Sequence, residues 1–509
     1  MNINFINSFE KTVELNFNKI AVTHNAENIA FNELKAKAQA LGCLIINKAE
    51  GAFNKPVAVL LPKEINAVIA DLGILYSANV FMNLDVKTPR ERLINILDLI
   101  KPSLIITSNK YKNIIENIDI KIILIDEIDF NNININYKEL KARLDKIIDT
   151  DPMCIINTSG STGTPKGVVL NHRSFFDFMA CSGEKFNFNG TEIIGSLSPI
   201  VFDIFDFELC MLMLYGSRLI LLDAFLASFP VKLLEALNLN KVNFIFWVPS
   251  IMVNIANMKL LEQVKLEYLK LIWFAGEVFP TKQFLYWYDN LFNAKFANLY
   301  GPIEITLDCT LYEINSRPPE NEPLPIGKPY KNTDVLILNE NNKICGAGEE
   351  GELCVRGTSL AMGYYNNPEK TLAAFTQNPL NKSYPELIYR TGDIVYTRED
   401  GNIMFKGRKD SLIKHMGYRI ELCEIEHVIE NDLKLVKYCC AVYNYNKKEI
   451  VLYYENNNNI ISDKDFRIAL KSVFPNYMIP NLFIHMEKLP QNTNGKIDRL
   501  ALKNLAGNI

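Results

Sequence analysis

Eleven consecutive residues give this chain its densest set of groups that could bind a polyphosphate. The segment Asn157–Gly167 contains five hydroxyl side chains, three glycines and one lysine. Glycine lets backbone N–H groups turn toward an anion without a Cβ in the way, and the hydroxyls and the ammonium add donors. The segment therefore predicts a phosphate-binding loop with these candidate contacts: Thr158, Ser159, Gly160, Ser161, Thr162, Gly163 and Lys166.

Two other interpretations of this segment are less favoured. A flexible surface turn has a similar composition, but the apolar runs 153–156 and 168–170 on either side are typical of short buried strands. The loop therefore joins elements of a core. A Walker A loop carries a hydroxyl residue directly after its lysine, whereas here Pro165 precedes Lys166 and Gly167 follows it.

The elements around this loop alternate between strand-like and helical patterns. A buried strand is predicted over residues 57–61 and a helix over 64–76, and further apolar runs at 104–106, 122–125, 219–222, 244–246 and 271–274 repeat the strand signal. Such alternation predicts the α/β class, with parallel sheets covered by helices. Short strands and turns from 334 to 407 predict a β-rich subdomain. A small α+β module is expected after Asp410, with a hairpin of 438–443 and 450–454.

Composition sets broad limits on the protein. A chain of 509 residues exceeds what one core usually serves, so two or more domains are expected. The net charge of −4 gives no reason to expect nucleic acid or an anionic membrane as a partner. The ten cysteines show no metal-ligand spacing, and residues 1–15 lack the pattern of a signal peptide. We therefore expect a cytoplasmic protein with free thiols.

Six further motifs follow the loop in a fixed order. The whole pattern resembles the ANL superfamily of adenylate-forming enzymes, which includes acyl-CoA synthetases, luciferases and the adenylation domains of non-ribosomal peptide synthetases. The resemblance is strongest to stand-alone amino-acid adenylation domains and to D-alanine–carrier-protein ligases. It covers nearly the whole chain and is carried by residues 298–304, 351–357, 389–393, 407–410, 417–421 and 494–499.

The resemblance implies a two-domain organisation and an ATP-dependent reaction. Residues 1–409 would form an adenylation core and residues 410–509 a small mobile domain, hinged at Asp410. A carboxylate would attack the α-phosphorus of ATP, giving an acyl-adenylate and pyrophosphate. Because such a reaction depends on aligning two anions and neutralising charge, Lys496 is implied as the catalytic cation and Glu304 as the Mg²⁺ ligand.

Each of these two residues also has a structural interpretation. Taken alone, a lysine after Asn-Gly is usually an exposed turn residue, and Glu304 after Gly301-Pro302 could start a helix. The motifs around them favour the functional roles. The superfamily usually has threonine where this chain has Ile303, which removes one hydroxyl near the phosphates.

The nucleotide contacts are also implied by the resemblance. Tyr300 would stack on adenine through its flat apolar face, with Leu299 and Gly301 beside it, and Asn298 would contact the edge of the base. Asp393 would accept both ribose hydroxyls, although a turn aspartate is the alternative. Arg408 would be a second contact to ribose or phosphate.

A second half-reaction is implied for the small domain. Gly417 would line a tunnel for a pantetheine thiol that attacks the adenylate. Because the chain ends about ten residues after the Lys496 motif, we expect the phosphopantetheine carrier to be a separate protein. The alternatives are an acyl-CoA synthetase that uses free CoA and a non-catalytic nucleotide-binding paralogue.

The acid to be activated is indicated by Phe202-Asp203. In amino-acid-activating members an aspartate at this place pairs with the substrate ammonium, and a buried charge needs such a partner. The alternative is an aspartate that caps a helix beginning near Ile204. The rest of the implied pocket is formed by Ile204, Phe207, Phe246, Trp273, Ala275, Gly276, Leu299, Leu307 and Asp308.

The implied pocket is lined by bulky aromatic residues. Phe207, Phe246 and Trp273 favour a small side chain, and Asp308 favours one that forms hydrogen bonds. Serine or alanine is therefore the predicted substrate. D-alanine is less favoured because the D-alanine ligases carry cysteine where Ala275 stands, and a basic amino acid paired with Asp308 is the remaining alternative.

Overall fold

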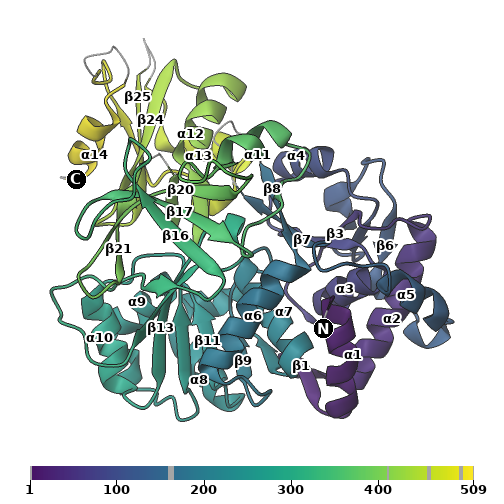
Figure 1. Ribbon diagram of the computed structural model, residues 1–509. Helices are drawn as coiled ribbons and strands as arrows, with labels where there is room; N and C mark the ends of the chain where they lie inside the picture. Colours follow the sequence, from purple (N-terminus) through teal and green to yellow (C-terminus); the bar gives the residue numbers. More distant parts are fainter. Residues whose placement is uncertain (1–2, 159–164, 410–411, 456–459, 492–496, 508–509) are drawn as a thin grey trace. The chain divides into compact units, whose positions relative to one another are not determined.

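The computed structural model describes residues 3–158, 165–409, 412–455, 460–491 and 497–507 (Figure 1). The chain forms two compact units. The first contains residues up to Val86, Lys101–Ile156 and Val168–Gly407, and the second contains Lys87–Ile100, Asn157–Gly167 and the chain from Arg408 onward. The boundary expected between 409 and 410 stays a prediction, and the expected hinge residue Asp410 lies outside the described residues.

A nine-stranded sheet in the first unit confirms the predicted α/β class. Its neighbouring strands run in the order β15-β14-β13-β12-β11-β9-β10-β1-β2, and the pairs from β13 through to β1 are parallel. The strands are β1 (Ile20–His24), β2 (Glu27–Ala30), β9 (Ile193–Ser196), β10 (Arg218–Leu221), β11 (Phe244–Trp247), β12 (Leu271–Phe274), β13 (Lys295–Tyr300), β14 (Thr310–Ile314) and β15 (Lys328–Pro329).

A seven-stranded sheet carries the strands on either side of the predicted phosphate loop. Its order is β18-β8-β7-β4-β3-β5-β6. The strands are β3 (Pro56–Leu60), β4 (Val80–Asn83), β5 (Ile105–Thr107), β6 (Ile122–Leu124), β7 (Pro152–Thr158), β8 (Lys166–Asn171) and β18 (Gly363–Tyr364). The two apolar runs that flank the loop are thus confirmed as neighbouring strands, β7 and β8.

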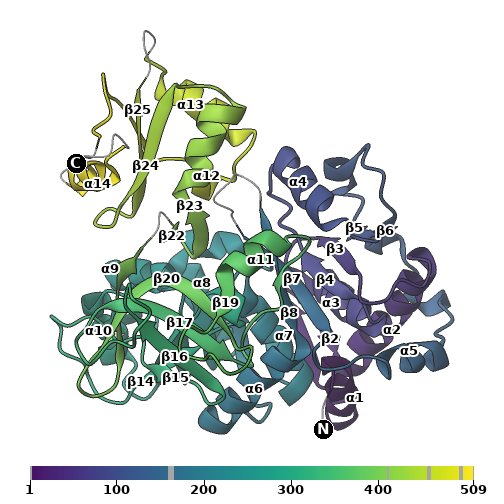
Figure 2. The same ribbon diagram turned by 45° about the horizontal axis from the view of Figure 1, so that its top comes forward.

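The helices of the first unit cover these sheets (Figures 1 and 2). Helix α7 is buried along almost its whole length and packs against α1, α6, β9 and β10. It therefore shows no polar face in the sequence. The helices are α1 (Phe5–Leu15), α2 (Phe31–Lys48), α3 (Ile65–Tyr76), α5 (Tyr137–Leu144), α6 (His172–Phe186), α7 (Asp203–Tyr215), α8 (Pro230–Leu239), α9 (Pro249–Asn257), α10 (Thr281–Asn290) and α11 (Pro368–Ala374).

The chain from Thr333 to Arg408 supplies a five-stranded sheet. Its order is β16-β17-β20-β19, with β21 paired to β20. The strands are β16 (Thr333–Leu338), β17 (Gly351–Gly357), β19 (Phe375–Gln377), β20 (Leu387–Thr397) and β21 (Ile403–Arg408).

The second unit contains the predicted hairpin. β24 (Tyr438–Asn444) and β25 (Glu449–Glu455) pair in antiparallel fashion (Figure 2), and β26 (Leu482–His485) joins β25 in parallel. A second hairpin has β22 (Leu412–His415) and β23 (Tyr418–Glu421) as its strands. The helices are α4 (Arg90–Ile100), α12 (Leu422–His427), α13 (Asp463–Lys471) and α14 (Arg499–Gly507). Within the described ranges, no helix is both long and apolar enough to cross a membrane.

Asp71 is one of several acidic side chains in the core of the first unit. Asp71 of α3 is fully buried, and its Oδ2 accepts a hydrogen bond of 3.1 Å from Nδ2 of Asn83 at the end of β4. Burial raises the pKa of Asp71 from 3.8 to about 8. The folded protein therefore keeps a proton here that the unfolded chain releases at lower pH.

This difference predicts a specific pH dependence of stability. Because the folded pKa of Asp71 is the higher one, the wild type loses about 1.4 kcal/mol of stability per pH unit between the two pKa values. We expect Asp71→Asn to remove that loss. The free energy of unfolding of the variant, relative to that of the wild type, should therefore rise by this amount per pH unit between pH 5 and pH 7. Urea unfolding at each pH measures it. The exposed Asp98→Asn is the control, and parallel pH profiles for wild type and Asp71→Asn would contradict the assignment.

Candidate active site

Parallel strands bring many of the predicted site residues to one edge of the nine-stranded sheet. Phe246 lies in β11, Trp273 in β12 and Asn298 to Tyr300 at the end of β13, while Ala275 and Gly276 directly follow β12. Ligands in α/β sheets bind beyond the carboxyl ends of the strands. The predicted nucleotide and substrate residues therefore share the edge at which such a site is expected.

The turn after β13 depends on Gly301. A Cβ at this residue would lie 2.3 Å from the carbonyl oxygen of Leu307 and 2.5 Å from the Cα of Asp308. Thr306 and Leu307 have φ values of +49° and +64°, a left-handed conformation that non-glycine residues rarely adopt. The strained residues lie in the turn that brings Leu307 and Asp308 back against Gly301.

The same turn carries the predicted metal ligand. Glu304 is fully buried, and its Oε1 accepts a hydrogen bond of 2.9 Å from the hydroxyl of Tyr364. Its backbone carbonyl accepts a bond of 2.9 Å from the N–H of Ala361. Tyr364 was not predicted from the sequence, because it lies sixty residues away and outside every motif. A carboxylate oxygen suits Mg²⁺, and no cluster of three His, Cys, Asp or Glu side chains able to hold a metal occurs in the described ranges.

Two predicted nucleotide residues contact each other. The hydroxyl of Tyr300 donates to Oδ2 of Asp393 in β20, and burial together with the Asp393 charge raises the pKa of Tyr300 well above its usual value. The hydroxyl of Thr391 accepts from the N–H of Asp393 at 3.0 Å and donates to the carbonyl of Leu353 at 2.7 Å. These bonds hold the Asp393 carboxylate in place, and a carboxylate has two oxygens that can accept hydrogen bonds.

Asn298 and the nearby residues complete this part of the site. Nδ2 of Asn298 donates to the carbonyl of Pro325 at 2.7 Å, and Asn298, Leu299 and Tyr300 are all buried. The bond to Pro325 uses the amide nitrogen of Asn298 and not its amide oxygen. The side chain predicted to contact the edge of a base is thus oriented by the loop before β15.

Asp203 is not the cap of its helix. Helix α7 begins at Asp203, its N-cap residue is Phe202, and Phe202 makes no side-chain capping bond. The alternative of a capping aspartate is therefore wrong. Asp203 is half-buried in the first turn, where the helix dipole favours a negative charge.

One turn further along α7, three predicted pocket residues pack together. The ring centroid of Phe207 lies 5.6 Å from that of Phe246 and 5.2 Å from that of Trp273, and the last two are 5.5 Å apart. All three rings are fully buried. Ile204, Ala275, Leu299, Leu307 and Asp308 are buried too.

Sequence reasoning missed Phe178, which contacts one of these rings, and Tyr330 next to it. The ring of Phe178 lies 6.0 Å from that of Phe207 and 5.1 Å from that of Tyr330. Burial, followed by the charge of Asp308, raises the pKa of Tyr330 well above its usual value. Both residues lie outside the motifs, so no local signal in the sequence points to them.

The end of β7 offers unused hydrogen-bonding groups. Thr158 is buried, and in the described part of the chain neither its hydroxyl nor the amide group of Asn157 has a hydrogen-bond partner. Buried polar groups without partners are rare in folded proteins, and these donors suit a phosphate. Lys166 begins β8. The remaining predicted loop residues lie outside the described ranges: Ser159, Gly160, Ser161, Thr162 and Gly163.

The other predicted residues belong to the second unit. Gly417 lies in the turn between β22 and β23 with φ +83°, and Arg408 is the last residue of β21. The left-handed conformation explains why glycine occupies this turn. Lys496 lies outside the described residues.

The chain is similar to known proteins along most of its length. A family model described as AMP-binding enzyme matches residues 9–365. The chain is 29% identical to zwittermicin A synthase ZmaJ of Bacillus cereus over 97% of this chain and 93% of that protein. It is 29% identical to gramicidin S synthase 1 of Brevibacillus brevis over 97% of this chain, but it spans 44% of that protein's length.

A solved structure shares the fold. The Vibrio cholerae adenylation domain AlmE, in complex with glycyl-adenosine-5'-phosphate, has a TM-score of 0.85 and 20% identity, covering 100% of this chain and 98% of that one.

The close approach at Gly301 leads to a direct prediction. In Gly301→Ala the added methyl group meets backbone atoms of Leu307 and Asp308, so we expect a loss of about 1–3 kcal/mol of stability, as in overpacked cores. Thermal unfolding measures it. Gly346→Ala is the matched control, because there the nearest atoms are side-chain atoms of Glu349 at 3.6 Å or more. Equal stability of the two variants would show that the turn does not need glycine.

Proposed function

Because the chain belongs to the AMP-binding enzyme family, we propose that it activates an amino acid as an aminoacyl-adenylate with release of pyrophosphate. The observation that carries the proposal is the position of Asp203. Its carboxylate lies in the first turn of α7, and the next turn of that helix presents Phe207 to Phe246 and Trp273. A charged group beside an apolar wall suits a substrate with an ammonium group and a small side chain.

The first half-reaction needs alignment of two anions. A carboxylate oxygen of the substrate attacks the α-phosphorus of ATP, the bond to the β-phosphate breaks, and pyrophosphate leaves with its electron pair. Thr158, Asn157 and Lys166 would hold the phosphates, and Tyr300 and Asp393 would hold the nucleoside. Lys496 would supply a cation at the reacting oxygens.

A metal ion would assist at Glu304. The residues fit Mg²⁺, since the buried carboxylate of Glu304 has one oxygen held by Tyr364. Mg²⁺ bound there would neutralise phosphate charge. The role of Tyr364 is to orient that carboxylate.

A second half-reaction would pass the aminoacyl group to a phosphopantetheine thiol on a separate carrier protein. The sulfur attacks the acyl carbon, the bond from that carbon to the phosphate oxygen breaks, AMP leaves, and the thiol proton is released. Gly417 supports this step because it has no side chain of its own that would obstruct a pantetheine arm.

The packing of the pocket residues indicates the size of the substrate side chain. The rings of Phe207, Phe246 and Trp273 pack against one another and have no exposed surface. Asp308, which is also buried, would accept a hydrogen bond. Serine or alanine is accordingly the proposed substrate.

Pyrophosphate exchange into ATP tests the proposal. We expect exchange that depends on a small amino acid, assayed with the twenty L-amino acids, D-alanine, D-serine and a series of fatty acids. Exchange with fatty acids alone would instead support an acyl-CoA synthetase. Nucleotide binding without exchange for any acid would support a non-catalytic paralogue.

The ammonium contact predicts a large effect of one substitution. Removing one partner of a buried charge pair costs about 3–5 kcal/mol, so Asp203→Ala should raise the KM for the amino acid more than a hundredfold. The KM for ATP should stay close to the wild-type value, because the proposed ATP contacts are elsewhere. A rise of less than tenfold in the amino-acid KM would argue against the contact.

A further inference from the structure

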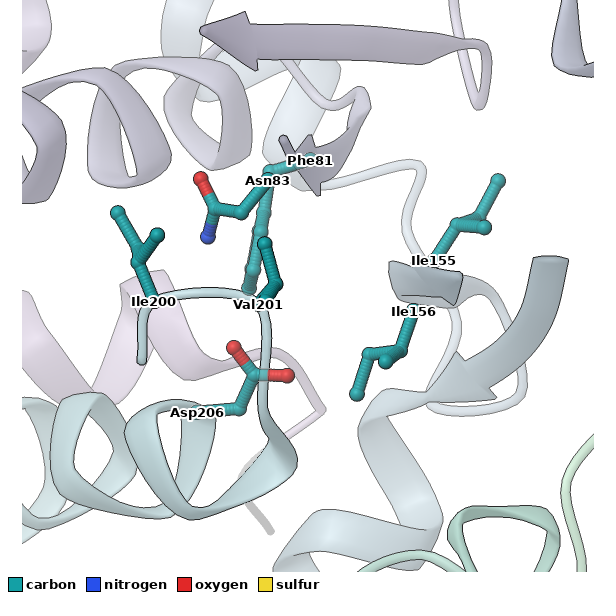
Figure 3. A pocket seen from close by; sticks show the side chains of 7 residues that line it. All are labelled: Phe81, Asn83, Ile155, Ile156, Ile200, Val201 and Asp206. Atoms are coloured by element: carbon teal, nitrogen blue, oxygen red, sulfur yellow. The ribbon is translucent and has the colours of Figure 1, made fainter. Parts of the chain in front are cut away.

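A small pocket behind the first turn of α7 has no part in the function proposed above (Figure 3). Its polar lining groups are the amide of Asn83, at the end of β4, and the carboxyl group of Asp206, which follows Asp203 by three residues in α7. The other lining residues are apolar: Phe81, Ile155, Ile156, Ile200 and Val201. All of them belong to the first unit.

The two polar groups are deeply buried and only partly satisfied. Asn83 is 6% exposed and Asp206 is 2% exposed. Nδ2 of Asn83 donates to Asp71, but its Oδ1 has no partner among the described residues. The thiol of Cys154 in β7 donates to Oδ2 of Asp206 at 3.4 Å. A protonated Asp71 carries a hydrogen that Oδ1 of Asn83 can accept.

Within the described ranges, the groups that act on the ionisation of Asp206 are carboxyl groups and a thiol, and none of them is a cation. The side chains that affect the ionisation of Asp206 are Asp71 from α3, Cys154 from β7, and Asp203 and Glu208 from α7 itself. A negative charge on Asp206 would also raise the pKa of Cys210 in α7. Lys63, the nearby buried cation, acts on Glu208 and donates to the carbonyls of Ser196 and Ser198 at 2.6 and 3.0 Å. Burial and these carboxylates raise the pKa of Asp206 well above its usual value.

A protonated Asp206 fits these surroundings. A neutral carboxyl group has one O–H donor and keeps its ability to accept hydrogen bonds. It can accept from Cys154, and as a neutral group it needs no cation beside it. Two buried carboxylates, Asp71 and Asp206, then no longer carry uncompensated negative charge.

We infer that Asp206 is a positioning residue that works as a neutral acid: it holds the first turn of α7 against β7 and leaves the charge of Asp203 to meet the substrate ammonium. The inference rests on the proposed function. β7 also ends in Thr158 of the predicted phosphate loop. The side chain of Asp206 therefore connects the helix that carries the ammonium contact with the strand that leads to the phosphate contacts.

Two identical substitutions, three residues apart, test the inference. Asparagine matches a neutral aspartic acid in shape and in hydrogen bonding, so Asp206→Asn should keep the amino-acid KM within about threefold of the wild type, whereas Asp203→Asn should raise it by tenfold or more. Asp206→Ala removes the hydrogen bonds and should raise that KM about tenfold with a smaller change in kcat. A KM for Asp206→Asn as high as that for Asp203→Asn would overturn the inference, and so would an unchanged KM for Asp206→Ala.

A spectroscopic measurement keeps the inference testable if Asp206→Ala fails to fold. Infrared difference spectra of wild type minus Asp206→Asn at neutral pH should show the carbonyl stretch of a protonated carboxyl group. A carboxylate band in its place would overturn the inference, whatever the kinetics. If the wild type shows no exchange that depends on an amino acid, the proposed function is wrong, and so is the ammonium contact of Asp203. The infrared band tests the protonation of Asp206 independently of that result.

Discussion

The approach of Gly301 to the backbone of Leu307 and Asp308 is the constraint on which the candidate site depends. Because glycine has no side chain, the chain can reverse directly after β13 and bring Asp308 back against Gly301. The same reversal places Glu304 under Tyr364 and leaves Tyr300 at the strand end facing Asp393. The strained backbone at Thr306 and Leu307 is accepted because the buried strands on either side fix both ends of the turn.

Buried acids are the second feature that shapes this region. Asp71, Asp206 and Glu208 all lie in the core of the first unit, where burial raises the pKa of each. Such groups lower stability unless a proton or an opposite charge compensates them. Lys63 compensates Glu208, and protons compensate the other two. Asp206 and Glu208 lie on α7, the helix that also carries Asp203, where a substrate ammonium would need a fixed anion.

Local sequence patterns predicted the parts of the structure that local patterns determine. The strands around the phosphate loop, the helix α3 and the hairpin of β24 and β25 follow from apolar runs and turn residues. The pairing of Tyr364 with Glu304 and that of Asn83 with Asp71 could not be predicted in this way, because each joins residues that meet only through the tertiary fold. The contact between α7 and β7 could not be predicted for a related reason. Helix α7 is buried along almost its whole length, so its sequence has no amphipathic pattern that would show which face meets β7.

A crystal structure with a seryl- or alanyl-sulfamoyl adenosine tests the central claim most directly, since this compound mimics an aminoacyl-adenylate. We predict the nucleoside beside Tyr300 with its ribose on Asp393, and the ammonium group on the carboxylate of Asp203. An analogue bound with its ammonium turned away from Asp203, or no analogue at the end of β13, would contradict it.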